Sequence, residues 1–196
     1  AYIYGYNDNT MAADNNLLRS EVSAMVHRLV KQNNKLGDFV YNESAAPAFE
    51  DIRGEWFRSG IEYINHKGAF AGGSSVYPYV EVTRGETFKI ICLGLGFSEK
   101  TNLSYENYAA ILQNAGYIQG DENGDLNIWK PITRAEFCTI YNRIIGRDKA
   151  MLVTANGVKI TAETYGFNDL KESSWYYETM LRATSAYDDN GYVDLE

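Results

Sequence analysis

The chain has 196 residues and a formal charge of −8, with hydrophobic residues at 45% and charged residues at 22%. This length allows one domain with a sizeable core or two small ones. The negative charge argues against general nucleic-acid binding, and no apolar run approaches the ~20 residues that a membrane span needs.

The N-terminal part predicts a loop followed by a helix. Residues 1–6 lack the basic and apolar regions of a signal peptide, so we expect a mature form or a piece of a longer chain. After this loop come Leu17-Leu18-Arg19-Ser20-Glu21. Apolar residues then recur with helical spacing, at positions 18, 22, 25, 26 and 29. One apolar face of this kind indicates an amphipathic helix.

The middle part predicts two helices separated by a glycine loop. Residues 31–48 are polar and predict a long connection. A short helix is expected from Trp56 to His66. A loop around Gly72 follows, and then Val82-Thr83-Arg84-Gly85-Glu86 begins a second helix with Phe88, Ile91 and Leu95 on one face.

The C-terminal half predicts the same order of elements. A helix over about 105–114 precedes the loop 116–124, and Pro131-Ile132-Thr133-Arg134-Ala135-Glu136 begins another helix that ends at Gly146. Residues 147–166 form a second irregular stretch. Within it, Asn156-Gly157 lies between β-branched residues, which predicts a small β-hairpin near 152–161.

These segments superimpose as three copies of one repeat, each with a glycine loop, an arginine and a glutamate in register. The same number of positions separates Gly5 from Arg19 and Gly120 from Arg134, and the middle copy is two shorter. The first copy lacks its leading helix, but 167–170 with Trp175 repeats 49–52 with Trp56. We therefore expect a single domain whose repeats comprise 1–30 completed by 167–196, 49–97 and 99–146. Closure requires the C-terminal helix to dock beside the N-terminal segment.

Two of the motifs fit a helix-capping box. In this arrangement Thr83 or Thr133 caps the helix and Glu86 or Glu136 reaches back to the capping residue. The first copy departs from the pattern, since Leu18 stands where the threonine should be. The capping role explains the threonine and the glutamate, but it leaves the arginine unexplained.

Arg19, Arg84 and Arg134 each stand at the first helical position, where the helix dipole disfavours a cation. A guanidinium beside free backbone amides is a candidate anion site. The alternative is an inherited structural arginine that pairs with a nearby acid such as Asp51 or Asp169.

Other residues suggest no further chemistry. Cys92 and Cys138 stand alone among apolar residues, which favours two buried free thiols over a disulfide framework or a zinc site. Asp121-Glu122-Asn123-Gly124-Asp125 lacks the spacing of a calcium loop and predicts a turn. His27 and His66 fit no catalytic pattern. We expect no metal, no cofactor and no enzymatic activity, although a carboxylate pair acting on glycan stays an alternative.

The three motifs resemble those of the S-layer homology domain, which carries an Ile-Thr-Arg-Ala-Glu segment after a glycine loop and a Phe-x-Asp…Trp helix. Residues 132–136 match fully, and 82–86 and 17–21 match in part. The resemblance implies a mainly α, pseudo-three-fold spindle of helix–loop–helix repeats around a central helical bundle. It also implies a location outside the cell, at a bacterial surface.

In that family the spindle binds secondary cell-wall polysaccharide, and the motif arginines hold the carboxylate of a pyruvate ketal. The resemblance thus makes Arg134, Arg84 and Arg19 anion ligands, and makes Trp56 and Trp175 candidates for the glycan site or for the core. Wall polysaccharide is the expected partner, with other surface-layer proteins as further candidates. The alternative is a degenerate repeat domain that assembles with proteins and binds no glycan.

Overall fold

The computed structural model describes residues 1–195, in which the chain is mainly helical. It forms two compact units. The terminal unit joins residues 1–15 to the chain from Thr133 onward, and the central unit runs from Asn16 to Ile132. The predicted mainly α class is confirmed, whereas the organisation as one domain of three repeats stays a prediction. Among the described residues, no helix has the length and apolar character needed to cross a membrane.

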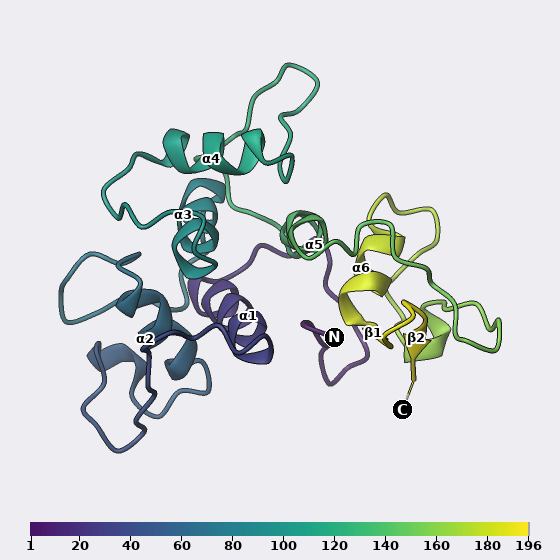
Figure 1. The fold of residues 1–196 in the computed structure, drawn as a ribbon, viewed down its shortest axis with the longest axis horizontal. Coiled ribbons are helices and arrows are strands. Elements are labelled where there is room, and N and C mark those ends of the chain that lie inside the picture. Colours follow the sequence, from purple (N-terminus) through teal and green to yellow (C-terminus); the bar gives the residue numbers. More distant parts are fainter. Residues whose placement is uncertain (196) are drawn as a thin grey trace. The chain divides into compact units, whose positions relative to one another are not determined.

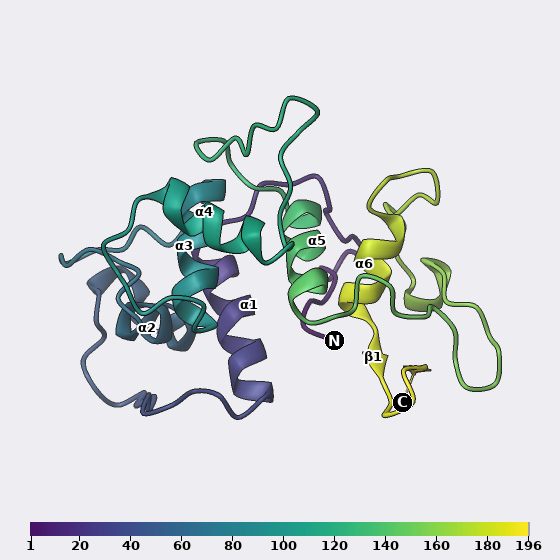
Figure 2. The same cartoon turned by 45° about the horizontal axis from the view of Figure 1, so that its top comes forward.

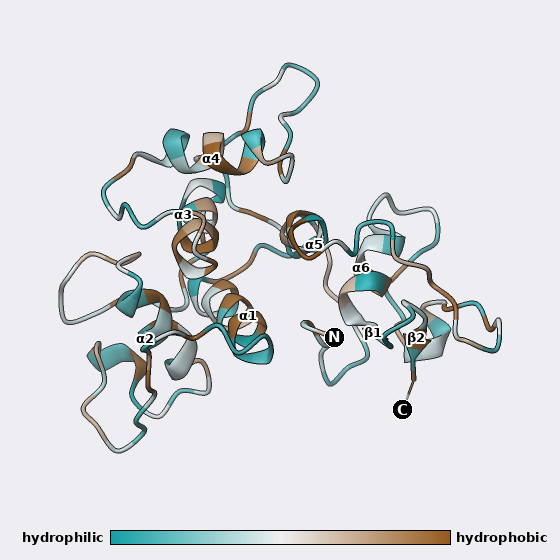
Figure 3. Ribbon diagram, viewed as in Figure 1, coloured by the Kyte–Doolittle hydropathy of each residue, from teal (hydrophilic) through white to brown (hydrophobic). Residues whose placement is uncertain are grey.

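The central unit contains four helices, α1 (Arg19–Gln32), α2 (Arg58–His66), α3 (Arg84–Gly94) and α4 (Tyr105–Asn114), and a 3-10 turn at Glu50–Ile52. Helix α1 packs against α2 and α3, and α4 packs against α3 (Figures 1 and 2). Most apolar residues of α1 and α3 are buried in the core. Figure 3 shows the hydrophobic parts of both helices in brown. Gly60 allows α2 to approach α1, since a Cβ there would lie 2.8 Å from Ala24 Cα.

The terminal unit contains α5 (Arg134–Ile144), a 3-10 turn at Glu163–Tyr165 and α6 (Tyr177–Thr184). Helix α6 packs against α5. The N-terminal segment lies along the end of α6, where the Tyr2 amide donates to the Ala183 carbonyl at 3.3 Å and the Thr184 hydroxyl donates to the Ile3 carbonyl at 3.3 Å. Segments from the beginning and the later part of the chain therefore share this unit (Figure 1). The closure expected from the repeat pattern requires this contact.

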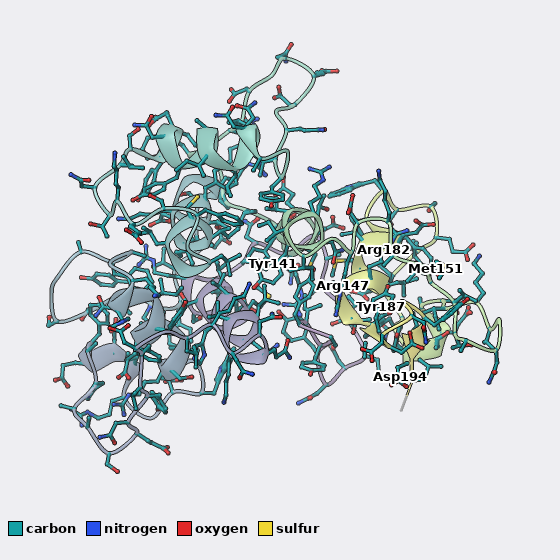
Figure 4. All side chains as sticks on the ribbon, in the orientation of Figure 1. Tyr141, Arg147, Met151, Arg182, Tyr187 and Asp194 are labelled. Atoms are coloured by element: carbon teal, nitrogen blue, oxygen red, sulfur yellow. The ribbon has the colours of Figure 1, made fainter. Side chains whose placement is uncertain are left out.

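Two arginines fasten the segment after α5 to α6. Arg147 donates to the Ser185 carbonyl at 3.3 Å, and Arg182 donates to the Ala150 carbonyl at 3.0 Å. The Arg147 guanidinium also lies 5.0 Å from the centre of the Tyr187 ring. Figure 4 labels these three side chains beside α6. The irregular stretch 147–150 is thus held by side chains rather than by regular secondary structure.

The strand pair lies at a different place from the predicted hairpin. Strands β1 (Ala186–Tyr187) and β2 (Val193–Asp194) form an antiparallel pair after α6. The predicted region 152–161 turns at Asn156-Gly157, and Val153 and Lys159 form an antiparallel bridge across the turn. The amides of Thr154 and Ile160 donate to the carbonyls of Val158 and Leu152, at 3.0 and 2.9 Å. The predicted hairpin is thus present as a short antiparallel pairing, and β1 and β2 form a second strand pair after α6 that was not predicted.

The other predicted helices are observed with small shifts. Helix α4 has the predicted bounds, and α2 starts at Arg58, two residues after Trp56. The motif helices α1, α3 and α5 all begin at the motif arginine. No helix or strand forms within 33–48, as the polar composition of this connection predicts.

Backbone hydrogen bonds connect equivalent residues of the three copies within the central unit. The residue two before each motif arginine donates its amide to the equivalent residue of another copy. Leu17 donates to Ile132 at 2.9 Å, Ile132 to Val82 at 3.1 Å, and Val82 to Leu17 at 2.9 Å. These three hydrogen bonds between buried residues link each copy to the other two in a ring. A pseudo-three-fold arrangement of the whole chain stays a prediction.

Candidate functional site

The first two amides of each motif helix bond to the loop of another copy, not to a ligand. In each helix, the two amides donate to the carbonyls that lie four and six residues before the motif arginine of another copy, at 2.8–3.0 Å. The six hydrogen bonds are Arg19 to Val80, Ser20 to Pro78, Arg84 to Lys130, Gly85 to Ile128, Arg134 to Asn15 and Ala135 to Ala13. The expectation of free amides beside each arginine was wrong. Repeat-to-repeat pairing uses these donors, and an anion must therefore be held by side chains.

The capping boxes of α3 and α5 are confirmed. The Glu86 amide donates to the Thr83 hydroxyl at 3.1 Å, and the Thr83 amide donates to the Glu86 carboxylate at 3.0 Å. Thr133 and Glu136 make the same two contacts. At α1 the Leu18 amide still donates to Glu21, but Leu18 offers no side-chain acceptor in return. Helix capping thus accounts for the threonine and glutamate of the motif.

Groups of the central unit hold the Arg19 guanidinium in place. Its Nη2 forms a 2.8 Å ion pair with Glu86, and its Nη1 donates to the carbonyls of Val76 and Tyr77. Asp51 and Asp169 were the acids expected to pair with a motif arginine, and they do not pair with Arg19. Nothing in the sequence indicated Glu86 for this role, because its capping function already accounted for it.

Asp51 and Asp169 instead hold the loops that face the arginines. The Asp51 carboxylate accepts from the amides of Val76 and Tyr77, at 3.1 and 2.8 Å. Asp169 accepts in the same way from Met11 and Ala12, at 2.8 Å each. The shared geometry of these two pairs explains the Phe-x-Asp motif as a loop anchor.

Arg84 lies within the central unit beside the loop that carries Leu126. Its Nε donates to the Leu126 carbonyl at 2.8 Å, eight residues before Arg134. Arg19 reaches the Val76 carbonyl, eight residues before Arg84. The two arginines thus occupy equivalent places. The Arg84 guanidinium also lies 5.6 Å from the centre of the Phe88 ring.

Arg134 belongs to the terminal unit and is only 6% exposed. Its Nη2 donates to the Tyr4 carbonyl at 2.7 Å, and its guanidinium lies 5.1 Å from the centre of the Tyr6 ring. Its Nε is buried and has no hydrogen-bond partner in the described part of the chain. An unused buried donor on a cation costs about 1–3 kcal/mol. This arginine is therefore the strongest candidate for an anion ligand.

Trp56 and Trp175 are surface residues, at 68% and 66% exposed, so they are not part of the core. Each ring touches the aromatic residue that follows it, Phe57 or Tyr176, at 5.4 and 5.3 Å between centroids. Sequence reasoning missed Trp129, which is 69% exposed and contacts Tyr105. Alignment on the motif arginines could have found it, since Trp129 and Tyr79 both stand five residues before one.

The remaining candidates have structural surroundings. Cys92 and Cys138 are buried free thiols, as predicted, and burial raises the pKa of each to about 12. The Asp121 carboxylate accepts from the amides of Asn123 and Asp125, which lowers its pKa. Across residues 1–195, no cluster of three or more His, Cys, Asp or Glu side chains could hold a metal ion.

The region around the third motif is similar to known proteins. The S-layer homology domain model matches residues 99–138, which include α4, the loop with Trp129 and the start of α5. The chain therefore contains a segment that matches the S-layer homology domain family. It is also similar to the surface-layer 125 kDa protein of Lysinibacillus sphaericus, with 37% identity over 70 residues.

That match covers 35% of this chain and 5% of the length of the relative. The matched family and the relative are those of surface-layer proteins, which points to a location at the cell surface. Each motif arginine of this chain begins a helix whose first amides bond to the loop of another copy.

Proposed function

We propose that this chain anchors a larger protein to the cell surface by binding acidic secondary cell-wall polysaccharide. The observation that supports this most directly is Arg134, a nearly buried cation with an unused donor. A carboxylate on the glycan, such as that of a pyruvate ketal, would supply the missing acceptor. Arg84 serves as a second anion ligand. Trp175 in the terminal unit and Trp129 in the central unit offer exposed rings to sugar faces.

A wall-binding experiment tests this proposal. The purified chain should sediment with wall sacculi and bind a pyruvylated disaccharide in a calorimetric titration. Arg134→Gln should weaken disaccharide binding by about 10- to 100-fold, because a charge-assisted hydrogen bond contributes about 1.5–3 kcal/mol. Arg53→Gln is a matched control, since Arg53 is an exposed arginine paired along its own turn with Glu50.

Unchanged binding after replacement of Arg134, Arg84 and Arg19 together would overturn the arginine mechanism.

One observation favours the second candidate, a protein-assembly domain without glycan binding. Arg19 already has a carboxylate partner in Glu86, so this motif arginine is committed to the fold. Flat titration with the disaccharide together with concentration-dependent association would select this alternative.

A further inference from the structure

The loop that faces Arg19 carries an unusual set of exposed rings. Tyr77 and Tyr79 are 65% and 59% exposed, and the exposed Trp56 shares the buried neighbour Phe57 with Tyr79. We call Trp56, Tyr77 and Tyr79 the aromatic triad. All three belong to the central unit. The equivalent positions in the other copies hold fewer rings, namely Trp175, Ala12 and Asp14 in the first copy and Ser104, Asn127 and Trp129 in the third.

Two of the triad rings are fixed in place although they face solvent. The Phe57 ring contacts Trp56 and Tyr79 edge-on, at 5.4 and 5.5 Å between centroids. The Tyr79 hydroxyl also hydrogen-bonds to Glu55, which raises the pKa of that phenol. Rigid exposed rings lose little conformational entropy on binding a ligand, and this favours a recognition role.

Tyr77 occupies a backbone conformation that its side chain does not favour. Its φ is +53°, and the Asp51 carboxylate holds its amide at 2.8 Å. The other two loops adopt the same conformation with Ala12 and Asn127. Asparagine tolerates this region far better than a bulky aromatic residue. Because the loop does not need a ring here, the strained tyrosine points to a functional demand.

The positive charge of Arg19 beside the aromatic triad is neutralised, unlike the charge expected of a site that binds an acidic sugar. Glu86 neutralises Arg19, and the carbonyls of Val76 and Tyr77 occupy the other side of its guanidinium. An acidic sugar would have to displace the Glu86 carboxylate, whereas a neutral sugar would not. Flat rings with polar rims suit the apolar face of a pyranose and its hydroxyl groups.

We propose that the aromatic triad beside the neutralised Arg19 binds uncharged pyranose residues of a glycan. This inference rests on the proposed function in that the chain binds wall polysaccharide, and it assigns a neutral section of that polymer to this loop. Acid recognition then belongs to Arg134 and Arg84, and stacking on neutral sugars belongs to Trp56, Tyr77 and Tyr79.

The test uses wall polysaccharide whose acidic substituents have been removed by mild acid, beside the intact polymer, in calorimetric titrations of the full chain. Wild type should bind the neutral polymer with an affinity that changes little with salt. Trp56→Ala and Tyr77→Ala should weaken this binding at least about fivefold. Val40→Ala, which changes an exposed apolar residue outside the triad, should change it less than about twofold.

The Tyr77→Asn variant distinguishes a binding role of the Tyr77 ring from a packing role, because the two roles predict different melting temperatures and affinities. Relief of the backbone strain should raise the melting temperature by about 2–4 °C while binding of the neutral polymer weakens. A lower melting temperature with unchanged binding would show that the ring serves packing, and would overturn the inference.

The remaining outcomes separate this inference from the proposed function. Binding of the intact polymer that depends on Arg134, with none of the neutral polymer, would overturn the inference alone. Binding of neither polymer would overturn both. Self-association that Trp56→Ala abolishes, without any glycan binding, would assign the triad to protein contacts and also overturn it.

Discussion

Arg19, the first residue of α1, forms a 2.8 Å ion pair with Glu86, the third residue of α3. The two oxygens of this carboxylate have different tasks. Oε1 accepts from Arg19, and Oε2 accepts from the Thr83 amide. One side chain therefore caps its own helix and neutralises the motif arginine of another copy. This dual role makes the Arg19 site unlike that of Arg134.

Removal of the Glu86 charge should separate its two tasks. Glu86→Gln keeps an oxygen for the Thr83 amide but loses the ion pair, so we expect destabilisation of about 1–2 kcal/mol in denaturant unfolding. The same change should free Arg19 and strengthen binding of an acidic disaccharide. Glu50→Gln removes one member of an exposed pair and should shift stability by less than about 0.5 kcal/mol. Equal effects of both changes would contradict a special role for Glu86.

Removing the helix cap in one copy should lower the stability, and adding the missing cap in another copy should raise it. Thr133→Ala removes the hydroxyl that accepts the Glu136 amide and should cost about 1 kcal/mol. Leu18→Thr supplies the missing acceptor at α1 and should recover up to ~1 kcal/mol, since Leu18 is only half-buried. Chemical denaturation of both variants measures the difference. A loss of stability in Leu18→Thr would mean that its apolar contacts outweigh a cap.

The contact between α1 and α2 should tolerate no side chain at Gly60. An added Cβ would meet the Ala24 backbone at 2.8 Å, so Gly60→Ala should destabilise by about 1–3 kcal/mol through overpacking. At Gly72 no atom lies within 4 Å of the position that a Cβ would take, so Gly72→Ala should be neutral or slightly stabilising. Thermal melts of the two variants provide the comparison. Similar melting temperatures would show that the helices can separate without loss.

Asp51 should matter more for the loop than its exposed neighbours. Asp51→Asn weakens the acceptor for the amides of Val76 and Tyr77 and should cost about 1–2 kcal/mol. Amide exchange at these two positions should quicken, because the loop then opens locally. Glu50→Asn, one residue earlier on the same turn, is the matched control. Unchanged exchange in the Asp51 variant would reject the anchoring role.

Alkaline pH should destabilise the chain through its buried thiols. Burial raises the pKa of Cys92 and Cys138 from an ordinary value of 9.0 to about 12, so the folded state keeps both protonated where the unfolded state has ionised. The free energy of unfolding is therefore fully maintained below pH 9 and falls between pH 9 and 12. The slope is up to ~1.4 kcal/mol per pH unit for each thiol. The double Cys→Ala variant should flatten this slope in urea titrations, and an equally steep slope would contradict the assignment.

The local elements of this protein could be predicted from residue spacing alone. Helical spacing of apolar residues placed α1, α3, α4 and α5, and the Thr-x-x-Glu pattern located two caps, because both signals depend on residues within a few positions of each other. The repeat register also identified the motif arginines.

The surroundings of those arginines became visible only in the folded chain. The pairing of Arg19 with Glu86, the use of the helix amides by loops of other copies, and the carboxylate contacts of Asp51 and Asp169 join residues far apart in the sequence. The strand pair after α6 was likewise not predicted from the sequence. Spacing cannot rank such long-range partners, because the free energy of each depends on which groups the folded backbone brings together and shields from water.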